Sequence, residues 1–121
     1  MGRAVDGIND PSAMPRHIRA GPVVLDLFHR DARIGEDWLR LHPREFGLFW
    51  RLAESPYERH SRLDLLKDVW RLRHDPETNR VAVTVARVRH KLARFDLGHL
   101  IATDLDQGGY FLDCEAAPVA V

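Results

Sequence analysis

The sequence predicts an α+β domain in which a small antiparallel sheet precedes three helices and a β-hairpin follows them. Three observations support this order. Short apolar runs bounded by Gly, Pro and Asp lie before residue 42. Three segments with apolar residues at helical spacing come next, separated by Pro-containing breaks. Finally, Gly108-Gly109 lies between two short apolar runs, which is typical of a hairpin turn. A chain of 121 residues is long enough for one domain with one core.

The first strands are predicted from short apolar runs. Val23–Phe28 has the composition of a strand, and we expect His29–Ala32 to form a polar turn after it. Arg33–Gly35 and Asp37–Leu41 follow as short strands, with Gly35-Glu36 between them. Together these runs would form a small antiparallel meander.

Pro43 and Ser61 mark the starts of the first two helices. Proline is favoured at the first helical position, where its missing N–H has no partner in any case. The first helix would end at Ser55-Pro56, and its apolar stripe consists of Phe46, Phe49, Trp50 and Ala53. Ser61 with Asp64 fits a capping box. The apolar face of the second helix would consist of Leu63, Leu66 and Trp70, supported by Leu65 and Val69.

A third helix is predicted over Asn79–Arg94, capped by Thr78 or Asn79. One buried stripe is formed by Val81, Val85, Val88 and Leu92. The many Val and Thr residues lower helix propensity, so a strand over Val81–Val85 competes with this prediction. The pattern continues to Leu92, which favours the helix.

The hairpin is predicted from Leu100–Asp104 and Tyr110–Asp113. The predicted domain therefore spans residues 22–114. Residues 1–21 lack apolar periodicity and are predicted to be a flexible tail. Residues 115–121 are predicted to be a second, frayed tail.

The charge of the chain is balanced overall but uneven along its length. Lys and Arg together number 18, as do Asp and Glu, so the formal net charge is zero. From Asn79 to Arg94 there are five basic residues and no acid. From Asp96 to the C-terminus there are five acids and no Lys or Arg. One basic helix in a neutral chain indicates weak non-specific binding to nucleic acid and dependence on specific contacts.

The sequence contains no motif typical of an enzyme, a metal site or a membrane segment. The four histidines considered as metal ligands lack ligand spacing and are expected to be solvated or capping residues: His60, His74, His90 and His99. Cys114 is the single cysteine and is expected to be inert. No apolar run approaches the ~20 residues of a membrane span, and Met1–Ala20 has no apolar leader. We expect a cytoplasmic protein that is not an enzyme and has neither cofactor nor metal.

One face of the third helix is polar. Arg80, Thr84, Arg87 and Lys91 lie at i, i+4, i+7 and i+11, offset by one position from the valine stripe. Such a face fits a major groove about 12 Å wide, where Arg bonds guanine and Thr reaches a base edge or a thymine methyl group. A solvated helix face is the alternative, and charge alone favours it.

Four segments carry a family resemblance: Leu41–Phe46, Ser61–Trp70, Val81–Leu92 and Ile101–Leu112. Their order and spacing resemble the C-terminal effector domain of OmpR/PhoB-type response regulators, over about residues 22–113. The resemblance implies a winged helix-turn-helix fold, with the hairpin as the wing. It also implies a recognition helix at about 79–94 that enters the major groove of double-stranded DNA. The linker Arg71–Glu77 is longer than a tight helix-turn-helix turn.

The resemblance implies a set of DNA-contacting residues. Arg62 and Trp70 match phosphate-contacting positions, although Trp70 also fits core packing. Thr103 and Tyr110 match wing positions that touch the DNA backbone, although Tyr110 also fits hairpin core. With the recognition helix, the predicted site consists of Arg62, Trp70, Asn79, Arg80, Thr84, Arg87, Arg89, Lys91, Thr103 and Tyr110.

The sequence also departs from the family. It shows no receiver domain, so a stand-alone regulator is expected, monomeric in solution and pairing head to tail on direct repeats. Ala82 and Thr84 replace the usual Asp and His of the recognition helix. The wing is one residue longer and carries Asp104 and Asp106, with Leu105, where the family offers an arginine. We therefore expect its tip to stay out of the minor groove. The alternative function is a protein-interaction module that contacts RNA polymerase or another regulator and binds DNA weakly.

Overall fold

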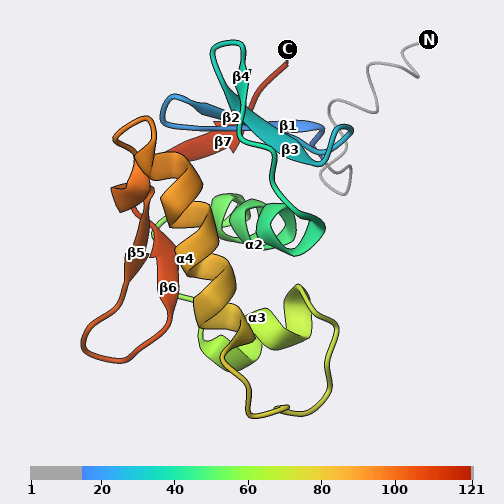
Figure 1. Ribbon diagram of the computed structural model, residues 1–121, viewed down its shortest axis with the longest axis vertical. Coiled ribbons are helices and arrows are strands. Elements are labelled where there is room, and N and C mark those ends of the chain that lie inside the picture. Colours follow the sequence, from blue (N-terminus) through green and yellow to red (C-terminus); the bar gives the residue numbers. More distant parts are fainter. Residues whose placement is uncertain (1–14, 121) are drawn as a thin grey trace, which may run out of the picture.

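The computed structural model describes residues 15–120, which form two antiparallel sheets and three helices (Figure 1). The predicted order of sheet, helices and hairpin is confirmed. Within this range, no helix combines the length and apolarity that crossing a membrane requires. The elements are β1 (His17–Ala20), β2 (Val23–Asp26), β3 (Asp31–Ile34), β4 (Asp37–Trp38), α2 (Pro43–Glu54), α3 (Arg62–Asp68), α4 (Arg80–Ala93), the 3-10 turn η1 (Gly98–Leu100), β5 (Ile101–Thr103), β6 (Tyr110–Leu112) and β7 (Ala116–Pro118).

Parts of both predicted tails are strands of the larger sheet, whose order is β4-β3-β2-β1-β7. Ile18 pairs with Pro118, and Ala20 pairs with Ala116. The tail prediction was therefore wrong for residues 17–20 and for residues 116–118, while residues 1–14 lie outside the described part. Each strand has only a few residues, and β1 and β7 come from opposite ends of the sequence, so β7 is ordered by tertiary pairing and not by a local signal.

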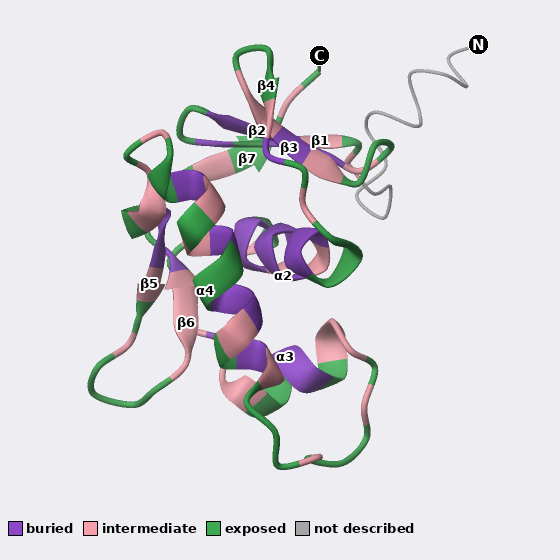
Figure 2. Ribbon diagram, in the orientation of Figure 1, coloured by how far each residue is buried: buried purple, intermediate pink, exposed green. Residues whose placement is uncertain are grey.

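β1 and β2 form a hairpin that turns at Gly21-Pro22, with Gly21 at a φ of 58°. This positive φ is accessible to glycine without strain. Ile18 and Ala20 of β1 point into the core, as do Val23 and Leu25 of β2. This face of the sheet covers α2, which Figure 2 shows as a largely buried helix beneath it.

β3 begins two residues earlier than predicted, because the turn occupies residues 27–30. Asp31 explains the difference: its carboxylate accepts hydrogen bonds from the backbone N–H groups of Ala32, Arg40 and Leu41 at 2.8, 3.1 and 3.0 Å. These bonds hold the chain that leaves β4 against the start of β3. β4 consequently ends at Trp38, before the predicted Leu41, and Arg40 takes a positive φ of 62°.

The first two helices begin where their caps predict. α2 has Pro43 at its first position and ends before Ser55. At the start of α3, the Ser61 hydroxyl accepts a hydrogen bond from the Asp64 N–H at 3.0 Å, and the Asp64 carboxylate accepts one from the Ser61 N–H at 3.2 Å. The predicted apolar face of this helix was partly wrong. Leu65 and Leu66 are buried, whereas Leu63 is 57% exposed.

The predicted stripe of the third helix is confirmed, since Val81, Val85, Val88 and Leu92 are all buried in α4. α4 packs against α2 and η1, and Arg89 joins it to the β5–β6 hairpin, which lies beside it in Figure 1. The hairpin also pairs with the loop before α3, because the backbones of His60 and Tyr110 exchange hydrogen bonds of 2.8 and 2.9 Å. Wing and helices therefore form one continuous unit.

Candidate nucleic-acid interface

The face of α4 opposite the valine stripe is open to solvent. Ala82, Ala86, Arg87 and His90 are exposed, and Arg80 and Val83 are half-buried. The helix carries no acid along its 14 residues. The exposed face of α4 is thus acid-free, as the sequence indicates, but its centre is apolar.

Arg87 is the most available cation on this face. It is exposed and has no hydrogen-bond or ion-pair partner among the described residues. Arg80 donates from Nε to the Thr78 hydroxyl at 2.9 Å, which leaves its other guanidinium nitrogens free within residues 15–120. Asn79 stands at the N-cap position of α4, but its side chain makes no capping bond there. The exposed face of α4 therefore offers two arginines, Arg80 and Arg87, that no acid within residues 15–120 neutralises.

Two of the four residues in the predicted polar face lie differently from expectation. Thr84 is only 8% exposed, so its hydroxyl is largely withdrawn from solvent. An offset of one position turns a side chain about 100° around a helix, and α4 is covered by α2 as well as by the hairpin, so its buried sector is wide. Lys91 is the second exception, because it faces a neighbouring helix.

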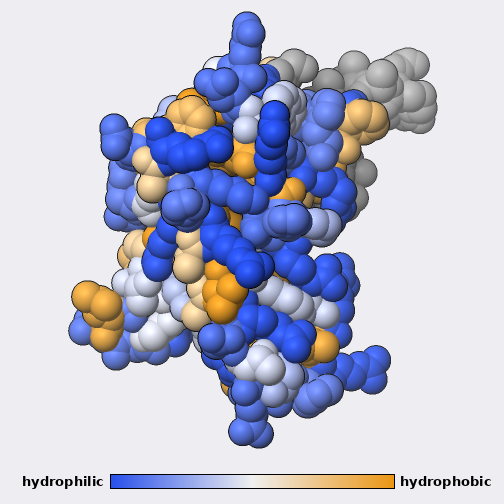
Figure 3. Space-filling view, viewed as in Figure 1, coloured by the Kyte–Doolittle hydropathy of each residue, from blue (hydrophilic) through white to orange (hydrophobic). Residues whose placement is uncertain are grey.

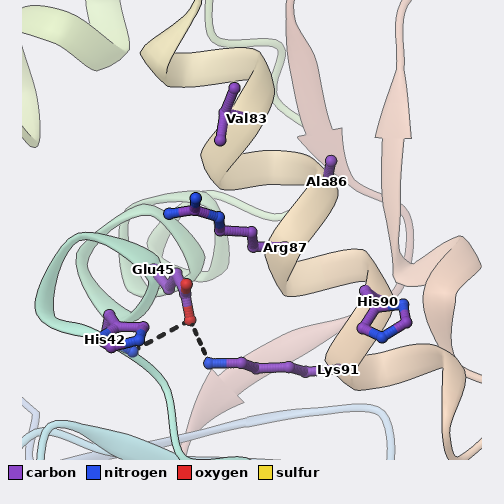
Figure 4. Close-up of a pocket in the computed structure, with 7 residues that line it drawn as sticks. All are labelled: His42, Glu45, Val83, Ala86, Arg87, His90 and Lys91. Carbon is purple, nitrogen blue, oxygen red and sulfur yellow. Dashed lines mark hydrogen bonds and ion pairs between the residues drawn. The ribbon is translucent and has the colours of Figure 1, made fainter.

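Lys91 forms an ion pair with Glu45 at the start of α2, with 2.6 Å between Nζ and Oε1 (Figure 4). It also donates to the Arg40 carbonyl at 2.7 Å. Glu45 accepts a further bond from the His42 N–H at 3.0 Å. Burial alone would raise the pKa of Glu45, but the bonds from Lys91 and His42 outweigh it and hold that pKa below its usual value. The lysine thus ties α4 to α2.

Arg62 spans the loop between α3 and α4. Its guanidinium binds both carboxylate oxygens of Asp75, at 2.6 and 2.7 Å, and donates to the Thr78 carbonyl at 2.7 Å. The hydrogen bonds from Arg62 and from the Glu77 N–H lower the pKa of Asp75 to about 2. Arg62 is therefore paired with a carboxylate throughout the neutral pH range, and its first role is to shape the loop that precedes α4.

Arg89 connects α4 to the wing. Its Nε donates to the Ile101 carbonyl at 2.8 Å, and a terminal nitrogen donates to the Thr103 hydroxyl at 2.7 Å. The guanidinium also lies 5.7 Å from the centre of the Tyr110 ring. These contacts place Thr103 and Tyr110 beside α4 at the base of the wing.

A groove beside α4 brings together residues from α2, from α4 and from the segment that follows α3. Its volume is about 490 Å³, and its lining includes Trp70, Arg80, Thr84, Arg87 and Arg44. Trp70 is half-buried, so one part packs while another faces the groove. Arg44 was missed at the sequence level. A cation in the first turn of a helix opposes the helix dipole, and that unfavourable placement is the signal that could have singled it out.

The tip of the wing is organised by Asp104. One of its oxygens accepts hydrogen bonds from the N–H groups of Asp106 and Gln107, at 2.9 and 3.0 Å, and these bonds lower its pKa. Leu105 at the tip is 91% exposed. The sequence offers no cation near the tip, yet the fold supplies one: Arg59 donates to the carbonyls of Gln107 and Gly108 and lies 3.9 Å from Asp104. The negative charge of the wing is thus partly compensated by a residue that sequence inspection missed.

His60 and Cys114 are two further candidate residues with titratable side chains. His60, expected to be solvated or capping, is buried, and its Nε2 has no hydrogen-bond partner within the described residues. Burial lowers the pKa of His60 and raises that of Cys114. No group of His, Cys, Asp and Glu suited to hold a metal ion occurs in residues 15–120.

An antiparallel sheet, three helices and a docked hairpin beside an exposed basic helix define a winged helix-turn-helix domain. Residues 35–112 match the family model "Transcriptional regulatory protein, C terminal". The chain belongs to this family.

Sequence relatives and solved structures agree with this assignment. The chain is 36% identical over 87 residues to the DNA-binding response regulator MtrA of Mycolicibacterium smegmatis, which covers 71% of this chain and 36% of the relative. The chain thus spans about a third of that protein's length. The DNA-binding domain of E. coli CadC superposes with a TM-score of 0.72 at 25% identity, covering 88% of this chain and 98% of that domain. The DNA-binding domain of Klebsiella pneumoniae RstA, solved with its RstA box, gives 0.69 at 25% identity and covers 81% and 97%.

Proposed function

We propose that this chain binds double-stranded DNA sequence-specifically and regulates transcription, with α4 in the major groove. The observation that carries the proposal is the acid-free exposed face of α4, where Arg80 and Arg87 project without a neutralising carboxylate among the described residues. An α-helix fits a major groove about 12 Å wide, and arginine is the side chain best suited to guanine. The relatives MtrA and RstA are DNA-binding proteins, which supports the same function here.

Under this proposal, some residues of the predicted site contact DNA directly and the others position or border the interface. Arg87 contacts a base, and Arg80 contacts DNA beside it, joined by Arg44 and Trp70 at phosphates. Arg62, Arg89 and Lys91 act through the loop, the wing and α2, because each already binds protein groups. Asn79, Thr103 and Tyr110 lie at the edges of the interface, and Thr84 supports the helix from beneath.

Replacing Arg87 with alanine should weaken binding to a selected duplex by roughly 10- to 100-fold, equivalent to about 1–3 kcal/mol. Arg87 is exposed, so the variant should fold normally. The full chain would first enrich duplexes from a pool with a randomised core, and fluorescence anisotropy would then measure affinity for the enriched sequence. Arg73→Ala, an exposed arginine in the loop between α3 and α4, serves as control. Equal affinities for the wild type and Arg87→Ala would disprove the assignment.

Enrichment of a duplex sequence, followed by a salt titration on enriched and random duplexes, separates the proposed function from the protein-interaction alternative. DNA binding that neutralises phosphates weakens steeply as salt rises, because counterions are released on binding. A partner module of the same fold would enrich no duplex sequence and would show only weak, sequence-independent binding. The zero net charge of the chain makes this control necessary.

The acidic wing tip should oppose DNA binding rather than assist it. Asp104 shapes the turn, so Asp106 is the acid to change. Asp106→Asn should tighten binding to any duplex by roughly twofold at low salt, without altering sequence preference, because a charge within about one Debye length of phosphate is repulsive. Asp113→Asn, beyond the wing, is the matched control. Weaker binding by Asp106→Asn would show that the tip makes a favourable contact.

We propose that the chain is monomeric in solution and pairs head to tail only on DNA. Two copies would occupy direct repeats whose centres lie about 10–10.5 bp apart, so that both face the same side of the duplex. Light scattering should give the mass of one chain without DNA. Inserting about five base pairs between the repeats should abolish paired binding while leaving single-site binding intact. A stable dimer in the absence of DNA would contradict the proposal.

A further inference from the structure

The centre of the exposed face of α4 is apolar. Ala82 and Ala86 are exposed, Val83 is half-buried, and their spacing of i, i+1 and i+4 places them next to one another on one side of the helix. Figure 3 shows apolar surface among the hydrophilic side chains in the region of α4. On one side this apolar centre continues into a shallow groove of about 400 Å³, lined by Val83, Ala86 and residues of α2 and α4 (Figure 4).

Helix stability does not account for all three residues. Alanine has the highest helix propensity, so Ala82 and Ala86 could serve α4 alone. Val83 cannot be explained in this way, because a β-branched residue lowers helix propensity and this side chain lies outside the core cluster. An apolar, β-branched side chain that is half-exposed on a helix surface, between Arg80 and Arg87 and next to Ala82 and Ala86, is available for an apolar contact in a complex.

The chemistry of the major groove limits what this apolar centre can recognise. Alanine and valine neither donate nor accept a hydrogen bond. Guanine, cytosine and adenine present mainly polar groups in the groove, and covering them with an apolar surface leaves those groups without partners. The thymine methyl group is the apolar group of a base edge. The flanking arginines match the phosphates and guanines that lie on either side.

On the basis of the proposed function, we infer that Ala82, Val83 and Ala86 recognise thymine methyl groups at the centre of the binding site. The preferred sequence under α4 then contains A·T pairs at the middle of the contact and a guanine at the position of Arg87. Ala82 stands where the family resemblance implies an aspartate, so a methyl-sized contact replaces an acid and the preferred sequence should differ accordingly.

The test removes single methyl groups from DNA. The full chain enriches duplexes from the randomised pool, and each thymine of the enriched sequence is then replaced by deoxyuridine, which pairs identically but lacks the methyl group. Affinity should fall about fourfold for each methyl group that α4 buries, at one or two neighbouring thymines. Thymines outside the contacted base pairs should tolerate the change, which provides an internal control.

A protein variant ties the effect to the named residues. In Val83→Ala the penalty for deoxyuridine should fall to less than about twofold at one of the sensitive thymines, since the partner methyl groups are gone. Ala93→Ser, at the exposed C-terminal end of α4, should keep the full penalty. If the enriched duplex is bound specifically but no thymine is sensitive, or if Val83→Ala keeps the full penalty, the inference is wrong while the proposed function stands. If no duplex is enriched, the proposed function itself fails, and the inference with it.

Discussion

Replacing Gly109 with alanine should separate the wing from the loop before α3 and lower the free energy of unfolding by roughly 3 kcal/mol. Gly109 has a φ of 90°, a conformation that side chains with a Cβ rarely adopt. A Cβ at this position would lie 2.5 Å from the carbonyl oxygen of His60. That oxygen accepts the hydrogen bond from the Tyr110 N–H, so the clash falls on the bond that joins hairpin and loop.

Gly108→Ala is the matched control for this prediction. Gly108 also has a positive φ, 75°, but a Cβ there would meet nothing within 4 Å. Gly108→Ala should lower the free energy of unfolding only by the backbone strain of an alanine at positive φ, about 1–2 kcal/mol. Urea denaturation of both variants gives the comparison. If the two variants lose equal stability, the approach of Gly109 to His60 does not matter for folding, and the wing is held by its side-chain contacts alone.

The helices were predictable because their signals are local. The buried positions of α4 repeat at helical spacing within one segment, and Ser61 with Asp64 caps α3 within four residues of sequence. Hairpin β5–β6 was predictable for the same reason, since Gly108-Gly109 lies at its turn. Patterns of this kind depend on the periodicity of one element, and tertiary packing only has to agree with them.

The strands at the two ends of the domain could not be predicted in the same way. His17–Ala20 does alternate between polar and apolar residues, and this alternation before Gly21-Pro22 is a weak signal that could have placed β1. β7 offers less, because Ala116–Pro118 contains a proline and no large apolar side chain. It forms on the edge of the sheet, where a proline is tolerated because the outer side needs no donor.

Cations of the candidate site show why charge in a sequence does not reveal its partner. Arg62, Arg89 and Lys91 look alike in the sequence to Arg87, yet each binds a carboxylate, hydroxyl or carbonyl elsewhere in the fold. These partners are between 12 and 51 residues away in sequence. Only the assembled fold separates the arginines that remain available from those that position the loop, the wing and α2.

Replacing Lys91 with methionine should be the other strongly destabilising change, at roughly 2–4 kcal/mol near neutral pH. The Glu45 side chain is 4% exposed and that of Lys91 is 23% exposed, so the variant leaves a buried carboxylate without its cation. The partial exposure of Lys91 places the expected loss toward the lower part of the range for buried pairs. Glu45→Gln combined with Lys91→Met should restore much of the stability, because a neutral amide still accepts the bond from the His42 N–H.

The dependence on pH distinguishes this pair from a simple packing effect. In the wild type the pKa of Glu45 is lowered, so its contribution is present above the unfolded value of about 4.3 and is lost as pH falls through the folded value. In Lys91→Met, burial without the cation should raise that pKa, so the variant should regain stability as pH falls from 7 toward 4. Urea denaturation at several pH values should therefore show the gap between wild type and variant narrowing toward acid. The difference in free energy of unfolding between the wild type and the double variant should also become smaller at low pH. There Glu45 of the wild type is protonated, and its ion pair with Lys91 no longer stabilises the fold. A gap between wild type and Lys91→Met that stays constant from pH 7 to pH 4 would mean that Lys91 contributes by packing alone, and that its charge is available to DNA after all.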